Sequence, residues 1–149
     1  MKQTTTVFTE TLTGEHARTG ADDVPLVLIV DDYRDCREMY AAYLEYAGFR
    51  VSKAANGGDA LQLARAEQPD LILMDLGLPG IDGVEVTRLL KADPATTKVP
   101  VVALTAQAGF GSARALAKLG FEAVITKPCP PDELAERVHS LVRAARSAR

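Results

Sequence analysis

A carboxylate that directly follows an unbroken apolar run is the clearest indication of chemistry in this sequence. Asp75 follows the run LILM at 71–74 and precedes a segment dense in turn residues, GLPGIDG at 77–83. A short apolar run bounded by turn residues predicts a strand buried on both faces of a sheet. Asp75 would then lie at the carboxyl end of a central strand, where open α/β sheets bind their ligands. A single aspartate after a strand is more often a turn or capping residue, so this interpretation depends on its neighbours.

Polar residues also end three other predicted strands. The apolar run at 26–30 leads into Asp31 and Asp32, the apolar strand predicted at 99–104 into Thr105, and the last predicted strand, at 121–126, into Lys127. The carboxyl ends of parallel strands share one edge of a sheet. We therefore expect all five side chains to converge at that edge.

This set of side chains favours phosphoryl transfer. Clustered carboxylates repel one another, and a hard divalent cation such as Mg²⁺ compensates with oxygen ligands. A lysine supplies a point charge for phosphoryl oxygens, and a threonine hydroxyl can donate one hydrogen bond to the same group. Catalysis of phosphoryl transfer is mainly positioning and charge neutralisation. The two histidines, His16 and His139, are interpreted as structural or solvated, so a histidine-activated nucleophile is not favoured.

Helices between the strands must hold these residues in place. Apolar spacing predicts amphipathic helices at 34–47, 59–67, 84–91 and 112–119, and a last one from Pro131, with a further strand at 49–54. Met39, Tyr40, Leu116 and Leu119 are among the residues predicted to face the core. Five β-α alternations indicate an α/β fold with a parallel sheet covered on both faces, and right-handed crossovers favour a doubly wound sheet.

Composition limits the class of protein. The chain has 149 residues, 47% hydrophobic and 25% charged, which suits one globular domain. No apolar run approaches the ~20 residues of a membrane helix, and the first residues lack the apolar core of a secretory signal. Two cysteines give no disulfide framework, so we expect a cytoplasmic protein without membrane insertion. A net charge of −3 gives no general attraction to nucleic acid.

The predicted organisation is one domain with short ends. Residues 1–24 are rich in threonine and show no sustained periodicity, so we expect a flexible N-terminal extension. The domain spans 25–146, and 147–149 form a C-terminal tail. The arginines after Glu136 could form a docking patch, but a solvated helix end is favoured.

The motifs at the strand ends resemble the receiver domain of bacterial two-component response regulators, most nearly the single-domain, chemotaxis-regulator-like type. They occur in the family's order and spacing over about residues 25–146: VDD at 30–32, MDL at 74–76, LPGIDG at 78–83, LTA at 104–106 and TKP at 126–128. The resemblance implies a flavodoxin-like (βα)5 fold with strand order 2-1-3-4-5, which the spacing alone does not fix.

The resemblance also assigns roles to individual residues. It implies that Asp75 accepts a phosphoryl group, and that Mg²⁺ is bound by Asp32, Asp75 and the backbone carbonyl of Gly77, with Asp31 acting through water. Phosphoryl oxygens would be held by Thr105, the amide of Ala106 and Lys127. It further implies a cis peptide bond between Lys127 and Pro128.

The family's partners and activity follow as expectations. The donor would be a histidine kinase or phosphotransfer protein. Because no effector segment follows the last helix, we expect a stand-alone receiver that signals by binding an unknown protein target, with no direct nucleic-acid contact. The expected target surface comprises residues 111–119, the last strand and the last helix. We expect a monomer or weak dimer, and a protein that catalyses only its own phosphorylation and dephosphorylation.

Two departures from the family pattern stand out. Receivers commonly carry a switching aromatic residue three positions before the lysine, where this chain has Val124. Cys129 follows the Lys-Pro pair and is interpreted as a buried small residue rather than a redox group. Two alternatives stay open: a receiver-like module that signals without phosphate, which Val124 favours, and a Mg²⁺-dependent hydrolase. Gly77 weakens the hydrolase, because such enzymes generally need a second carboxylate there.

Overall fold

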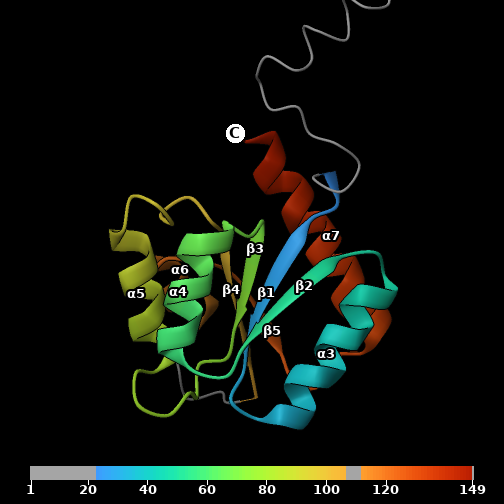
Figure 1. Ribbon diagram of the computed structural model, residues 1–149, viewed down its shortest axis with the longest axis horizontal. Helices are drawn as coiled ribbons and strands as arrows, with labels where there is room; N and C mark the ends of the chain where they lie inside the picture. The colour runs from blue at the N-terminus through green and yellow to red at the C-terminus, as the bar shows by residue number, and fades with distance from the viewer. Residues whose placement is uncertain (1–22, 107–111, 149) are drawn as a thin grey trace, which may run out of the picture.

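A five-stranded parallel sheet forms the centre of the protein. The computed structural model describes residues 23–106 and 112–148, and within them the strand order is β2-β1-β3-β4-β5 (Figure 1). This confirms the predicted doubly wound α/β sheet and the strand order that the resemblance implied. The strands are β1 (Leu26–Val30), β2 (Arg50–Ala54), β3 (Leu71–Met74), β4 (Val101–Thr105) and β5 (Phe121–Thr126).

Helices cover both faces of the sheet, as Figure 1 shows. One face carries α3 (Arg34–Tyr46) and α7 (Pro131–Ser147). The other carries α4 (Gly57–Glu67), α5 (Gly83–Ala92) and α6 (Ala113–Lys118). Because all the strands are parallel, their carboxyl ends meet at one edge, and β1, β3, β4 and β5 bring polar residues there.

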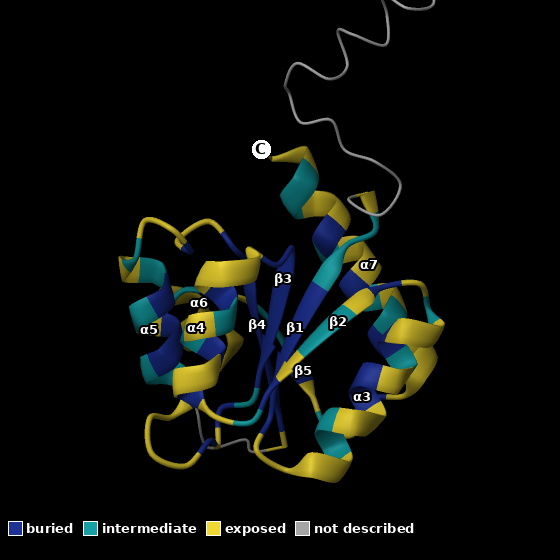
Figure 2. Cartoon of the chain, viewed as in Figure 1, coloured by how far each residue is buried: buried dark blue, intermediate teal, exposed yellow. Residues whose placement is uncertain are grey.

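The apolar runs at the centre of the sheet are buried on both sides. β3 and β4 are buried along their whole length, and β1 from its second residue on (Figure 2). Successive residues of a strand face opposite sides. Leu28 and Val30 therefore join the core beneath α4, α5 and α6, whereas Val27 and Ile29 join the core beneath α3 and α7.

Local sequence signals set the helix ends. Gly48, which follows Ala47 at the C-cap of α3, has φ +104°, a left-handed conformation that glycine adopts without steric cost. The side chains of Asn56, Asp82 and Ser112 accept hydrogen bonds from backbone amides in the first turns of α4, α5 and α6. These caps satisfy amides that have no partner within the helix.

Some residues predicted for the core are exposed, Met39 and Leu119 among them, and several element ends differ by one or two residues. Met39 is 39% exposed because the buried face of α3 is narrower than predicted and comprises Tyr40, Ala41 and Leu44. Leu119 is 48% exposed because α6 ends at Lys118 and buries only Leu116. The strand predicted from 49 begins at Arg50, and the helix predicted from 59 begins at Gly57.

Some expectations concern residues beyond the described ranges. Almost all of the predicted extension at 1–24, and most of the loop expected at 106–111, lie outside the described residues. Within 23–106 and 112–148, no helix is both long enough and apolar enough to cross a membrane.

Candidate functional site

Three carboxylates meet at the carboxyl edge of the sheet. Asp31 and Asp32 directly follow β1, and Asp75 directly follows β3, its neighbour in the sheet. The amide of Asp75 donates to the carbonyl of Val30 at 2.9 Å, which fixes the two strand ends side by side. One carboxylate oxygen from each aspartate lies within 4.8 Å of the others. Asp31 is fully buried, Asp75 half-buried and Asp32 exposed.

Lys127 brings a positive charge to the three carboxylates. Its Nζ lies 2.7 Å from Oδ2 of Asp31 and 3.7 Å from Oδ2 of Asp75. Its backbone amide donates to the carbonyl of Thr105 at 3.0 Å, so the ends of β5 and β4 are held together. The lysine side chain is only 13% exposed. The ammonium therefore interacts with the carboxylates in a partly dehydrated setting, where ion pairs are stronger than in water.

Burial and neighbouring charges shift the pKa values of Asp75 and Lys127. Burial raises the pKa of Asp75 above its ordinary value, and the charges of Asp31 and Asp32 raise it further. The amide of Gly77 and the charge of Lys127 act in the opposite direction without cancelling the increase. Burial alone would lower the pKa of Lys127, but the hydrogen bond and charge of Asp31 leave it raised. The lysine therefore stays positively charged beside the acids.

Asp31 is the anchor of the cluster. Its Oδ2 accepts from Lys127, and its Oδ1 accepts from the amide of Tyr33 at 2.9 Å. Its backbone carbonyl accepts from Nη1 of Arg37 at 2.9 Å. Arg37 was not predicted as part of the site, because nothing in its spacing distinguishes it from other helical arginines. Because protein donors already use both oxygens of Asp31, the exposed Asp32 is better placed for direct contact with a cation.

The loop after β3 folds back onto Asp75. The amide of Gly77 donates to Oδ1 of Asp75 at 3.0 Å, and Asp82 caps α5 through a 2.9 Å hydrogen bond from Glu85. Gly83 begins α5 so close to the site that a Cβ there would lie 2.3 Å from the carbonyl oxygen of Asp75. Gly83 belongs to the turn-rich segment at 77–83, but its close approach to Asp75 was not predicted, because that approach depends on how α5 packs.

Thr105 and Ala106 complete the edge of the site. Thr105 ends β4 and is buried, whereas Ala106 is exposed. The peptide bond between Lys127 and Pro128 is cis, the isomer that the resemblance implies. The structure therefore brings the predicted strand-end residues to one edge of the sheet.

The residues that depart from the family pattern have ordinary packing roles. Val124 is half-buried, pairs in register with Ala103 and packs against the core beneath α4, α5 and α6. Cys129 is 6% exposed, and burial raises the pKa of its thiol, which disfavours the reactive thiolate. The ring of His139 lies 4.3 Å from that of Phe49, away from the acids, so its structural interpretation agrees with the geometry.

The arrangement can hold a hard cation and an anionic group side by side. Carboxylate oxygens are the ligands that Mg²⁺ prefers, and the exposed Asp32 leaves room for water ligands. A neighbouring ammonium can bind an oxyanion that reaches Asp75. Comparison of the sequence with known protein families identifies the family. The family model of the response regulator receiver domain matches residues 27–139.

The chain belongs to the response regulator receiver domain family. This receiver is 39% identical over 114 residues to the polar-differentiation response regulator DivK of Brucella anthropi, covering 76% of this chain and 93% of DivK. It is also 39% identical over 117 residues to the phosphate regulon transcriptional regulatory protein PhoB of Pseudomonas aeruginosa. That match covers 78% of this chain but only 51% of PhoB, so the chain spans about half the length of that relative.

Solved receiver structures share the fold. A CheY-like receiver domain protein from Methanospirillum hungatei superposes with a TM-score of 0.77 at 27% identity, covering 85% of this receiver and 100% of that chain. The receiver domain of a sensor histidine kinase from P. aeruginosa superposes with a TM-score of 0.73 at 31% identity, covering 80% and 98%. The latter has a magnesium ion coordinated in its active-site cleft. The predicted family is thus confirmed. It is a family of signalling domains, the receivers of response regulators.

Proposed function

We propose that this receiver accepts a phosphoryl group on Asp75 from the phosphohistidine of a histidine kinase or phosphotransfer protein. The observation that carries the proposal is the position of Lys127, whose Nζ lies 3.7 Å from Oδ2 of Asp75. A carboxylate that is half-buried, near the protein surface and next to a lysine can meet an incoming phosphoryl group whose charge the lysine offsets.

In the proposed transfer, a carboxylate oxygen of Asp75 attacks phosphorus. The bond between phosphorus and the histidine nitrogen breaks, its electron pair stays on the imidazole, and an acyl phosphate forms on Asp75. Lys127 would hold one phosphoryl oxygen, while Thr105 and the amide of Ala106 would hold others. Water would later hydrolyse the acyl phosphate to phosphate and the free carboxylate. The protein thus catalyses only its own modification.

We propose Mg²⁺ as the cofactor of this site. Asp32, Asp75 and the carbonyl of Gly77 would bind the ion, with Asp31 acting through water because its oxygens already accept hydrogen bonds. The ion, when bound, neutralises the acids and polarises phosphoryl oxygens. The magnesium in the related kinase receiver supports this assignment.

We propose that the phosphorylated receiver signals by binding another protein, and that the binding surface comprises α6, β5 and α7. Val124 has no ring that could change rotamer, so Thr105 and the segment after it would carry the change instead. Residues 107–111 of that segment lie outside the described residues. A monomer or weak dimer in the cytoplasm, without direct nucleic-acid contact, remains part of the proposal.

Intact-mass spectrometry after treatment with acetyl phosphate and Mg²⁺ tests the acceptor. Wild type should gain one phosphoryl mass, and Asp75→Asn should gain none. Omission of Mg²⁺ should also prevent the adduct. A wild type that stays unmodified by acetyl phosphate and by a phosphorylated kinase, although it binds Mg²⁺, would favour the phosphate-independent interaction module instead.

The melting temperature tests the metal assignment separately. Millimolar Mg²⁺ should raise the melting temperature of wild type, because a ligand that binds only the native state stabilises it. Asp32→Ala should abolish this increase, whereas Asp35→Ala, which removes a neighbouring exposed acid outside the cluster, should retain it. An identical response in wild type and Asp32→Ala would remove Asp32 from the site.

A further inference from the structure

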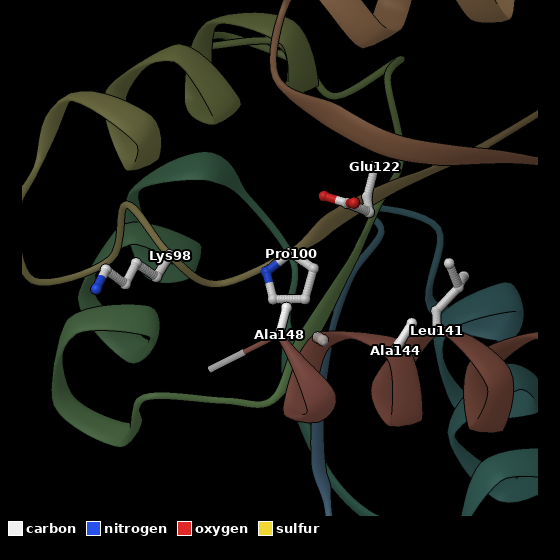
Figure 3. A pocket seen from close by; sticks show the side chains of 7 residues that line it. Lys98, Pro100, Glu122, Leu141, Ala144 and Ala148 are labelled. Atoms are coloured by element: carbon white, nitrogen blue, oxygen red, sulfur yellow. The ribbon is translucent and has the colours of Figure 1, made fainter.

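A groove lies between α7 and the amino-terminal ends of β4 and β5. It encloses about 620 Å³, within the ~300–1,000 Å³ typical of binding pockets. Figure 3 shows the ring of Pro100 between Glu122 on one side and Ala144 and Ala148 on the other. Its lining is mostly small and apolar, because α7 contributes Leu141 and two alanines to it, and Ala148 directly after the helix adds a third alanine.

This groove is separate from the acid cluster. Pro100 precedes β4 and Glu122 is the second residue of β5, whereas Thr105 and Lys127 lie at the other ends of these strands. Parallel strands hold their two ends at opposite edges of the sheet. An occupant of the groove would therefore leave Asp75 open to a phosphodonor.

The N-terminal segment enters the described structure beside the same helix. The carbonyl of Asp23 accepts a hydrogen bond from Nη1 of Arg146 at 3.2 Å. Arg146 is in the last turn of α7 and also pairs with Asp70 at 3.3 Å. Residues 1–22 therefore connect to the domain at the end of α7, and Ala145 and Ala148 of that end line the groove.

The segment is long enough to reach the groove. To do so it must pass around the end of α7, a distance of about 10–12 Å, which is the diameter of a helix with its side chains. Leu12 precedes Asp23 by 11 residues, and that much extended chain spans roughly 36 Å. The length of the segment therefore allows residues near position 12 to contact the groove.

The segment carries side chains that suit the groove. Phe8 and Leu12 are four positions apart, a spacing that places two residues on the same face of either a helix or a strand. Glu10 lies between them, and Lys98 at the groove makes no ion pair with any described residue. Two apolar anchors around one acid match an apolar groove with a lysine at its margin.

We propose that residues 8–12 dock intramolecularly in this groove, with Phe8 and Leu12 against Pro100 and the alanines of α7 and with Glu10 near Lys98. The groove is then an internal docking site for the N-terminal segment. A partner that binds the groove must displace that segment.

Backbone amide NMR on the full chain tests the docking. Phe8→Ser/Leu12→Ser should shift the amide signals of Lys98, Glu122, Ala144 and Ala148, although these residues are far from positions 8 and 12 in the sequence. In the reverse direction, Ala144→Gln should shift the signals of Phe8 and Leu12. Arg143→Gln is the matched control, since Arg143 is exposed on α7 and does not line the groove. It should leave those two signals unchanged.

The outcomes distinguish the possible occupants. Shifts confined to the sequence neighbours of positions 8 and 12 would overturn the proposal. Shifts that disappear on dilution would also overturn it, and would assign the groove to a second copy of the chain. Shifts that are independent of concentration and reciprocal would establish intramolecular docking.

Discussion

Nζ of Lys127 lies 2.7 Å from Oδ2 of Asp31, and the two residues are 96 positions apart in the sequence. The carboxylate of Asp31 is fully buried, so the lysine offsets a charge that water does not reach. The pair joins the ends of β5 and β1 and leaves Asp75 3.7 Å from the same ammonium. A residue expected to bind phosphate is therefore also a structural partner of the acid cluster.

Removal of Lys127 should destabilise the protein. Lys127→Ala leaves Asp31 buried without its cation, which should lower the free energy of unfolding by about 3 kcal/mol. Urea unfolding with a chelator present measures this change. Added Mg²⁺ should reduce the loss, because a cation at the acids then replaces part of the missing charge.

Lys53→Ala is the matched control for this loss. Lys53 pairs with Glu38 at 2.9 Å, but the two side chains are 39% and 49% exposed. An exposed pair contributes at most about 1 kcal/mol, so its loss should be small. Equal losses in the two variants would contradict the view that burial gives the Lys127–Asp31 pair its strength.

The ionised form of Asp75 should destabilise the folded protein in the absence of metal. Its pKa is raised on folding, mainly by burial, so the folded state binds a proton more tightly than the unfolded state. Stability therefore decreases as the pH rises from the ordinary pKa of about 3.8 through the folded-state pKa. Asp75→Asn should stabilise the protein at neutral pH by on the order of 1 kcal/mol, a common gain at active sites.

Urea unfolding in a chelator at a series of pH values measures this dependence. The difference between Asp75→Asn and wild type should shrink as the pH falls below the ordinary pKa of an aspartate, where both side chains are neutral. A difference that stays constant with pH would show that packing rather than charge causes it.

Thr87 occupies a position in α5 where a hydroxyl is unfavourable. It is fully buried, and its Oγ1 has no hydrogen-bond partner among the described residues. Valine has nearly the same shape without the polar atom, so Thr87→Val should raise the free energy of unfolding by about 1 kcal/mol. Chemical denaturation measures the change, and phosphorylation should be unaffected because the site contacts are retained.

Thr96 provides the opposite case. It is 1% exposed, but its Oγ1 donates to the carbonyl of Leu90 at 2.7 Å. Thr96→Val should therefore lower the free energy of unfolding by about 1 kcal/mol. The same sign in both variants would contradict the hydrogen-bond assignment at one of these positions.

Gly83 should be intolerant of even one added methyl group. In a helix, alanine is ordinarily favoured over glycine by about 1 kcal/mol. Here the added Cβ would lie 2.3 Å from the carbonyl oxygen of Asp75, and backbone would have to move. Gly83→Ala should lower the free energy of unfolding by about 1–3 kcal/mol and slow phosphorylation by acetyl phosphate.

Gly58→Ala is the corresponding control in α4. Its nearest neighbour for a Cβ is Oδ1 of Asn56 at 3.5 Å, an ordinary contact. Alanine there should leave phosphorylation unchanged and raise stability by up to about 1 kcal/mol. A Gly83→Ala variant as stable and as readily phosphorylated as Gly58→Ala would refute the role of the close approach.

The sequence by itself determined the alternation of elements and the edge at which the chemistry lies. Mostly apolar segments that lead into Asp31, Asp75, Thr105 and Lys127 predict buried parallel strands, and parallel strands place their carboxyl ends together. The order of the strands came from the family resemblance. Apolar spacing reports which residues are buried, but it does not report which strands are neighbours.

Only the tertiary structure decided the distances and exposures that govern the site. It placed Lys127 against Asp31, aligned Arg37 with the carbonyl of Asp31, and packed Gly83 onto Asp75. It also exposed Met39, which the helical spacing had assigned to the core. These features arise from packing between elements far apart in the chain, and local pattern carries no information about that packing.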